Sequence, residues 1–189
     1  MRNDARPAHP LAIALIETLR PLPNVRVADF GSGRGRNTAA LKAARFSVCE
    51  IADDRVHDFS EGGAFDAMVS THALLHGAVR DIEALLDVIA RALKPRGLLY
   101  ATFGSTSDAR YGKGERIDPN TFAPAAGDEQ GVPHAYFDER SLRRMLERHF
   151  AIDSIEERIV DDVVGSWAHP QRPKGSVHWM VRARLSKDQ

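Results

Sequence analysis

Short apolar runs alternate along the chain with longer segments in which apolar positions recur every three or four residues. The first pattern predicts strands at residues 25–29, 46–51, 65–70, 97–103, 150–160 and 176–185, and the second predicts helices at 10–20, 36–44, 81–93 and 138–149. Strands that alternate with helices form a mostly parallel sheet with helices on both faces. Pro170 and Pro173 mark a turn between the last two strands, which we therefore expect to pair in antiparallel fashion.

A glycine-rich turn follows the first predicted strand. Asp29 ends the strand, and Gly31, Gly33 and Gly35 come before the helix at 36–44. Such a turn presents backbone N–H groups and the positive end of a helix to a ligand, and glycine lets the ligand lie against the main chain. The dinucleotide-binding pattern G-x-G-x-x-G requires a further glycine at position 36, where this chain has Arg36. The turn therefore favours a nucleotide-like ligand other than NAD.

The spacing D-x-G-x-G-x-G resembles motif I of the class I S-adenosylmethionine (SAM) methyltransferases. Three further segments follow in the order of that family: Asp53-Asp54 after the second strand, residues 65–76, and Lys94-Pro95-Arg96-Gly97, where the family often has L-K-P-G-G. The resemblance covers roughly residues 25–103. It implies a Rossmann-like, doubly wound, mostly parallel sheet with an antiparallel C-terminal strand, SAM as the cofactor, and methyl transfer as the activity.

The resemblance also implies a set of cofactor contacts. Asp29, Gly31 and Gly33 would lie beside the methionine part of SAM, and Asp53 would bind the ribose hydroxyl groups, a position that dinucleotide folds also use. In the family, a later loop supplies an acidic acceptor for the adenine amine and an apolar wall; in this chain Asp58 and Phe59 could supply them, with a plain connector as the alternative. The complete predicted cofactor set is Asp29, Gly31, Gly33, Arg34, Asn37, Asp53, Asp58, Phe59 and Thr71.

The connection after the second strand is shorter than the family requires. Only about twelve residues, 53–64, lie between the second strand and the strand at 65–70, whereas a complete βαβ unit takes about 30 residues. We therefore expect the third strand of the family to be absent or vestigial.

Histidines follow the strand at 65–70, where open α/β sheets bind their ligands. His72 and His76 would share one face of a helix that begins at Thr71, and histidine is suited to proton transfer near neutral pH. We predict that His72, His76 and His134 are catalytic, with packing or helix capping as the alternative. A histidine pair at this spacing also suggests a metal, but no acidic ligand follows as in H-E-x-x-H, so no metal site is expected.

Residues 104–137 form the longest stretch without a predicted helix or strand. Such a stretch is typical of a lid, a binding loop or a mobile surface loop. We interpret it as a substrate lid, with Tyr111, Arg116 and Tyr136 as substrate contacts. His178 of the last strand is a fourth candidate contact, with a structural, hydrogen-bonded histidine as the favoured alternative. The lid pattern and the chain ending look similar to small bacterial methyltransferases with tellurite-resistance or generic small-molecule roles.

Composition narrows the choice of partners. The 189 residues are 43% hydrophobic and carry no net charge, which predicts a single domain over 1–189 and argues against nucleic-acid binding. Cys49 is the only cysteine, and no apolar stretch reaches membrane-spanning length, so we expect a cytoplasmic monomer or homodimer acting on a small-molecule acceptor. A non-enzymatic SAM-binding module and an NAD-type oxidoreductase are the alternatives.

Overall fold

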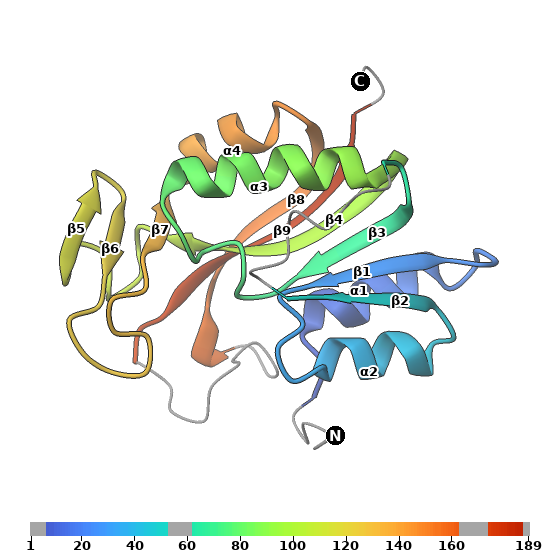
Figure 1. The fold of residues 1–189 in the computed structure, drawn as a ribbon, viewed down its shortest axis with the longest axis horizontal. Coiled ribbons are helices and arrows are strands. Elements are labelled where there is room, and N and C mark those ends of the chain that lie inside the picture. The colour runs from blue at the N-terminus through green and yellow to red at the C-terminus, as the bar shows by residue number, and fades with distance from the viewer. Residues whose placement is uncertain (1–6, 53–61, 163–173, 187–189) are drawn as a thin grey trace.

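A mostly parallel sheet forms the middle layer of the structure, with two helices on each face (Figure 1). The computed structural model describes residues 7–52, 62–162 and 174–186. Its helices are α1 (Pro10–Leu19), α2 (Arg36–Ala43), α3 (Val79–Ala92) and α4 (Glu139–Leu146). Its strands are β1 (Arg26–Phe30), β2 (Ser47–Ile51), β3 (Phe65–Ser70), β4 (Leu93–Ser105), β5 (Glu115–Asp118), β6 (Thr121–Ala123), β7 (His134–Phe137), β8 (Phe150–Ile159) and β9 (Val177–Leu185).

The strand order confirms the predicted fold class. The sheet runs β2-β1-β3-β4, with these four strands parallel, and β9 pairs with β4 in antiparallel fashion. The predicted antiparallel pair β8–β9 is present. Within the described residues, which leave out 53–61, no strand lies beyond β2 at that edge of the sheet.

Alternating side chains bury the two faces of the sheet against different helices. Val27 on β1 packs with Leu15 of α1 and Leu41 of α2. The next residue, Ala28, belongs to the opposite core, which contains Leu86 of α3. Strands covered on both faces read as nearly continuous apolar runs, which explains why these strands were visible in the sequence.

Two helix starts are fixed by side-chain caps. Asp138 accepts a hydrogen bond from the Ser141 N–H at 2.6 Å and caps α4. Asp81 accepts one from the Ala78 N–H at 2.9 Å, so α3 begins at Val79, two residues before the predicted start. In the described part of the chain, no helix is long and apolar enough to cross a membrane.

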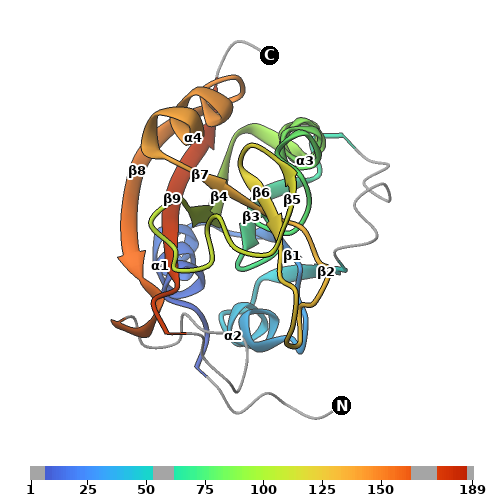
Figure 2. The same ribbon diagram turned by 90° about the vertical axis from the view of Figure 1, so that its left-hand side faces the viewer.

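The predicted lid contains secondary structure that the sequence pattern did not indicate. Strands β5, β6 and β7 form an antiparallel set, and β7 joins the main sheet by pairing in parallel with the end of β4. We call residues 115–137 the β5–β7 extension. Figure 2 shows it from the end of the molecule where the extension faces the viewer. The expectation that this segment lacks strands is therefore wrong, because it enlarges the sheet, and its role as a substrate lid stays a prediction.

Candidate functional site

The glycine turn has the conformation that only glycine adopts readily. Gly31, Gly33 and Gly35 have φ angles of 71°, 52° and 78°, in the left-handed region. Gly35 is also the N-cap of α2. The N–H of Gly31 donates to the Ile51 carbonyl at 2.9 Å, which fixes the turn against the end of β2. The turn therefore sits at the carboxyl ends of β1 and β2, as predicted.

Asp29 is the buried charge of this turn. Its side chain is 1% exposed, and Oδ2 accepts a hydrogen bond from the Thr38 hydroxyl at 2.6 Å. Oδ1 has no hydrogen-bond partner within the described residues. Burial raises the pKa of Asp29 to about 6, and the hydrogen bond from Thr38 only partly offsets this. A buried carboxylate with one unsatisfied oxygen suits a ligand that brings a positive charge.

Asn37 and Thr71 connect the turn to the segment after β3. The Asn37 side-chain amide donates to the Thr71 hydroxyl at 2.9 Å, and its oxygen accepts from the His9 N–H at 2.9 Å. Both side chains are buried, so they shape a wall of the site and hold α1, α2 and β3 together. Arg34 is exposed in the turn. Asp53, Asp58 and Phe59 lie outside the described residues.

The predicted histidines separate into two groups, because no helix begins at Thr71. Residues 71–78 form bends and turns, and His72 has a φ of 70°. The prediction that His72 and His76 share a helix face is therefore wrong. His72 lies near His9 and His178, with ring centroids 6.0 and 5.1 Å away. We call these three residues the His72 cluster.

In the His72 cluster, the ring of His72 is half-buried, whereas those of His9 and His178 are buried. Burial, followed by the charges of Arg110 and His9, lowers the pKa of His178 to about 3. Burial and the neighbouring His72 also lower the pKa of His9 well below its usual value. The His72 N–H donates to the Thr102 hydroxyl at 2.8 Å, which holds its backbone against β4. His9 could not be found from the sequence, since nothing in its local pattern links it to position 72.

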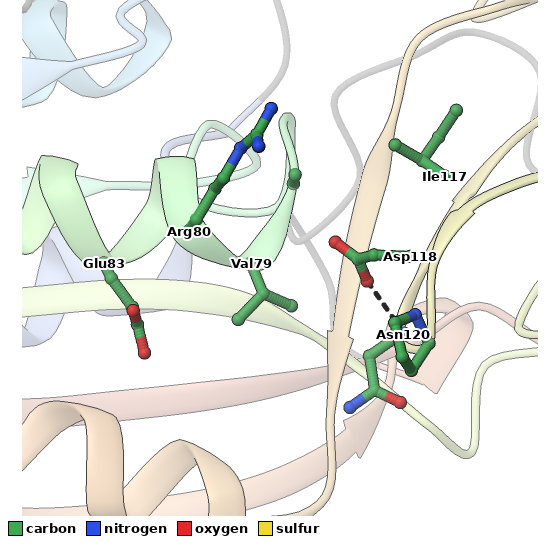
Figure 3. A pocket seen from close by; sticks show the side chains of 8 residues that line it. Val79, Arg80, Glu83, Ile117, Asp118 and Asn120 are labelled. Atoms are coloured by element: carbon green, nitrogen blue, oxygen red, sulfur yellow. Dashed lines mark hydrogen bonds between the residues drawn. The ribbon is translucent and has the colours of Figure 1, made fainter.

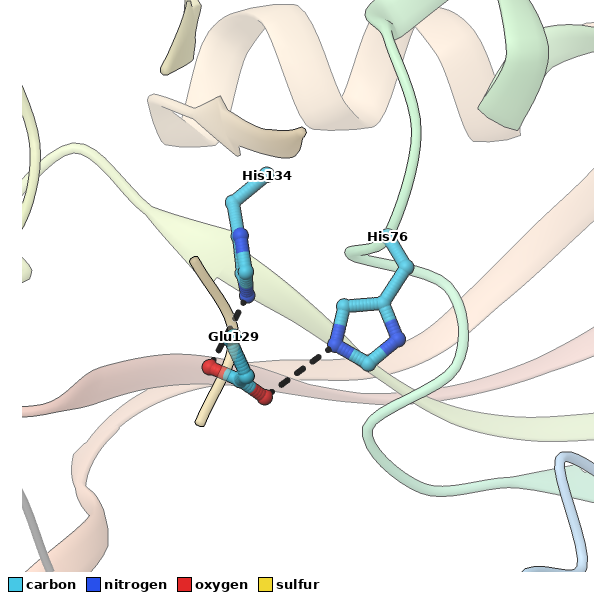
Figure 4. Close-up of side chains that lie close together, drawn as sticks. All are labelled: His76, Glu129 and His134. Carbon is cyan, nitrogen blue, oxygen red and sulfur yellow. Dashed lines mark ion pairs between the residues drawn. The ribbon is translucent and has the colours of Figure 1, made fainter. Parts of the chain in front are cut away.

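His76 and His134 form the second group together with Glu129 (Figure 4). Nε2 of His76 lies 3.5 Å from Oε1 of Glu129, and Nε2 of His134 lies 3.2 Å from Oε2. Arg110 also donates to Oε2, at 3.0 Å, and is paired with the buried Asp108 at 3.3 Å. Nothing in the local sequence around Glu129 or Arg110 indicated a role for either residue, because the contacts of Glu129 with Arg110 and His76 join residues that are distant in the chain.

The predicted substrate residues are only partly brought together. Tyr111 and Tyr136 are in edge-to-face contact, with ring centroids 5.6 Å apart, and Phe122 completes this aromatic group. Burial raises the pKa of Tyr136 to about 12, so its phenol stays protonated. Arg116 is exposed on β5 and donates to the Asp118 carbonyl, away from these rings. His178 belongs to the His72 cluster.

A separate groove lies between the start of α3 and the β5–β6 turn (Figure 3). Val79, Arg80 and Glu83 line one side, and residues 117–120 line the other. None of its lining residues belongs to the glycine turn or to either histidine group.

A family described as "Methyltransferase domain" matches residues 5–149. The chain belongs to this methyltransferase family. The expected class of enzyme, a SAM-dependent methyltransferase, is thereby confirmed, and a methyl transfer is favoured over the non-enzymatic and NAD-dependent alternatives. No curated protein sequence matches the chain.

Solved structures confirm the fold. The 1,6-didemethyltoxoflavin N1-methyltransferase of Burkholderia thailandensis, with bound 1,6-didemethyltoxoflavin and S-adenosylhomocysteine, is 19% identical, with a TM-score of 0.66 over 95% of this chain and 77% of that one. A SAM-dependent methyltransferase of Methanosarcina mazei is 16% identical, with a TM-score of 0.68 over 89% and 96% of the two chains. The magnesium protoporphyrin IX methyltransferase of Synechocystis, with bound SAM, is 16% identical, with a TM-score of 0.56 over 93% and 78%.

Proposed function

We propose that this methyltransferase transfers the methyl group of SAM to a small-molecule acceptor held beside the His72 cluster. The observation that carries the proposal is Asp29, whose buried carboxylate keeps one oxygen unsatisfied within the described residues, next to three left-handed glycines. The ammonium group of the methionine part of SAM fits that oxygen, and the glycines leave room for the cofactor against the main chain. When bound, SAM supplies a methyl group that its sulfonium has already activated.

The protein's main task in such a transfer is alignment. Holding two reactants in the correct geometry can contribute about 7–11 kcal/mol to the lowering of the barrier. Asp29 would hold the cofactor at the end of β1, and Asn37 and Thr71 would shape the adjacent wall. Because each of these side chains is buried and hydrogen-bonded to another element, the fold itself holds this part of the site in place.

His72 is the best candidate for accepting a proton from the acceptor. The lowered pKa values of His9 and His178 keep both rings neutral near pH 7, so a proton taken up by His72 does not face two charged imidazoles. His72 is half-buried and therefore reachable by a small ligand. General-base catalysis by a positioned side chain contributes about 10²–10⁴-fold to a rate.

Two observations favour a small acceptor over a macromolecule. The aromatic group and the histidines on this side of the sheet are largely buried, which suits a compact ligand. The structurally similar Burkholderia enzyme has 1,6-didemethyltoxoflavin bound together with S-adenosylhomocysteine.

Calorimetry of the full chain with SAM and with NAD tests the cofactor. Asp29→Ala and Gly33→Val should each abolish SAM binding, whereas Asp153→Ala, which removes an exposed ion pair with Arg184, should leave it unchanged. Binding of NAD alone, or unchanged SAM affinity in both glycine-turn variants, would overturn this assignment.

A screen with methyl-labelled SAM tests the acceptor. Thiols, chalcogen oxyanions, amines, carboxylates and phenols form the small-molecule arm, and mixed peptides and oligonucleotides form the other. Label transfer to one small-molecule class supports the proposal, and transfer only to peptides or oligonucleotides contradicts it. With the acceptor found, His72→Ala should lower kcat about 10²–10⁴-fold with SAM affinity retained, whereas His149→Ala, on the opposite helical layer beside Asp87, should not.

A further inference from the structure

His76, Glu129 and His134 come from three segments that the fold brings together. His76 follows β3, Glu129 lies between β6 and β7, and His134 begins β7. The backbones are joined here, because Gly77 donates to the Pro133 carbonyl and Ala135 donates to the Leu75 carbonyl, both at 2.8 Å. The three side chains point toward one another in Figure 4. We call them the His76 triad.

The hydrogen bond on the far side of His134 determines which atom faces the triad. Nδ1 of His134 lies 2.8 Å from the Val132 carbonyl. A carbonyl only accepts, so Nδ1 carries the proton in this bond, and Nε2 presents either a lone pair or a second proton to Glu129. A lone pair 3.2 Å from a carboxylate oxygen is repulsive. A positive charge, either a proton or a metal ion, must therefore lie between Nε2 and Glu129.

The separations match those between ligands of one metal ion. Bonds of about 2.0–2.2 Å in a tetrahedral zinc site put neighbouring ligand atoms about 3.3–3.6 Å apart. Nε2 of His76 lies 3.5 Å from Oε1 of Glu129 and Nε2 of His134 lies 3.2 Å from Oε2, so each imidazole faces a different oxygen of the carboxylate. All three ligand atoms lie within 4.8 Å of one another. The β-bridge between His76 and His134 holds the two imidazoles on neighbouring backbone segments, with ring centroids 4.9 Å apart.

The surroundings resemble the outer shell of a metal site. Metal-bound histidines usually donate their other ring N–H to a backbone carbonyl or a carboxylate, as His134 does to Val132. Arg110 holds the Glu129 carboxylate from outside, and its own charge is balanced by the buried Asp108.

We propose that the His76 triad binds one divalent transition-metal ion of the zinc type. Two imidazoles and a carboxylate suit zinc, and three protein ligands leave a coordination position open. Glu129 is the acidic ligand that is missing from the sequence next to His76. It rests on the proposed function only in one respect: the open position would take an anionic oxygen or sulfur of the methyl acceptor, which it would orient near the His72 cluster.

The test is metal binding by the full chain, measured without an activity assay. Protein freed of metal with a chelator is titrated with Zn²⁺ by calorimetry, and Co²⁺ is added separately to record the visible absorption of a low-coordinate site. We expect one ion per chain. Glu129→Gln and His76→Asn should each weaken Zn²⁺ binding at least about tenfold, in line with the loss seen even for outer-shell changes.

His149→Asn is the matched control. It removes the imidazole of another histidine–carboxylate pair, with Asp87 2.6 Å away, and should leave Zn²⁺ affinity unchanged. His76 and Glu129 are chosen over the buried His134 because their side chains are 29% and 24% exposed, and thermal melting reports whether each variant folds. Absence of stoichiometric binding, or equal affinity in both triad variants and the wild type, would show that the triad is only a protonated ion-pair network. SAM affinity should be the same in all variants, so a failure of the metal site is separable from a failure of the proposed function.

Discussion

Lowering the pH should weaken cofactor binding through Asp29. Burial raises the pKa of its carboxyl group from 3.8 to about 6 in the free protein. A bound ammonium group favours the ionised form, so the bound protein holds the proton less tightly and affinity rises with pH up to the free-state pKa. At pH 7 about nine-tenths of the free protein is ionised at Asp29, and at pH 5 about one-tenth is. SAM affinity should therefore fall about tenfold between pH 7 and pH 5, which is about 1.4 kcal/mol.

The raised pKa of Asp29 also makes the stability of the ligand-free protein depend on pH. Because the folded pKa is raised, the folded protein holds a proton that the unfolded chain has already lost between about pH 4 and pH 6. The ligand-free protein should thus become less stable as pH rises through this window, opposite to the trend in SAM affinity. As the pH falls from 6 to 4, titration of Asp29 should lower SAM affinity and raise the stability of the ligand-free protein. A general acid denaturation would instead lower both.

Calorimetry with SAM at pH 5, 6 and 7 and constant ionic strength measures the first effect, and thermal melting without ligand measures the second. Asp29→Asn should remove the pH dependence of whatever affinity remains. Asp66→Asn is the control, since the salt bridge with Lys94 keeps the pKa of Asp66 below its usual value despite partial burial. An affinity that is flat from pH 5 to pH 7 in the wild type, or a control variant that loses the slope, would refute the reasoning.

Three substitutions test the packing that supports the site. Gly114→Ala would place a Cβ 2.0 Å from the Ala123 carbonyl oxygen and should lower the free energy of unfolding, measured by chemical denaturation, by about 1–3 kcal/mol. Gly112→Ala, whose Cβ meets nothing within 4 Å, should cost less, and equal losses of stability would contradict this. Asp108→Ala leaves a buried β9 N–H unsatisfied and should cost about 1–3 kcal/mol and speed hydrogen exchange at that amide; an unchanged exchange rate would contradict it. Leu86→Ala in the α3 core should cost about 2–5 kcal/mol in the same denaturation assay, with SAM affinity retained.

The parts of the fold that follow from local pattern were predictable. Strands β1 and β3 are covered on both faces, so their apolar runs are continuous, and the glycine turn is legible because left-handed φ angles demand glycine. Strands β5, β6 and β7 were missed because they have only three or four residues, too few for an alternating pattern, and β5 is polar and largely exposed. Their formation depends on pairing with one another and with β4, which a local pattern does not contain.

The histidine groups show a second limit of local reasoning. His72 and His76 are close in sequence, and helical spacing would have joined them, but turns with left-handed φ angles at His72 and Gly77 direct the two side chains to different partners. The contacts that define each group are long-range, with His9 and His178 on one side and Glu129 on the other. No spacing within residues 71–76 encodes them.

The β5–β7 extension changes how the acceptor side of the site is expected to work. A lid that opens and closes needs few bonds to the body of the protein. Here β7 pairs with β4, the Ala135 N–H donates to the Leu75 carbonyl, and Trp179 of β9 donates to the Phe137 carbonyl, so the extension is fixed to three parts of the fold. If the predicted acceptor contacts on this segment are correct, these side chains are held in place by the fold, which favours selectivity from a preformed site. It follows that substitutions in the extension should lower stability and acceptor affinity together and leave SAM affinity unchanged.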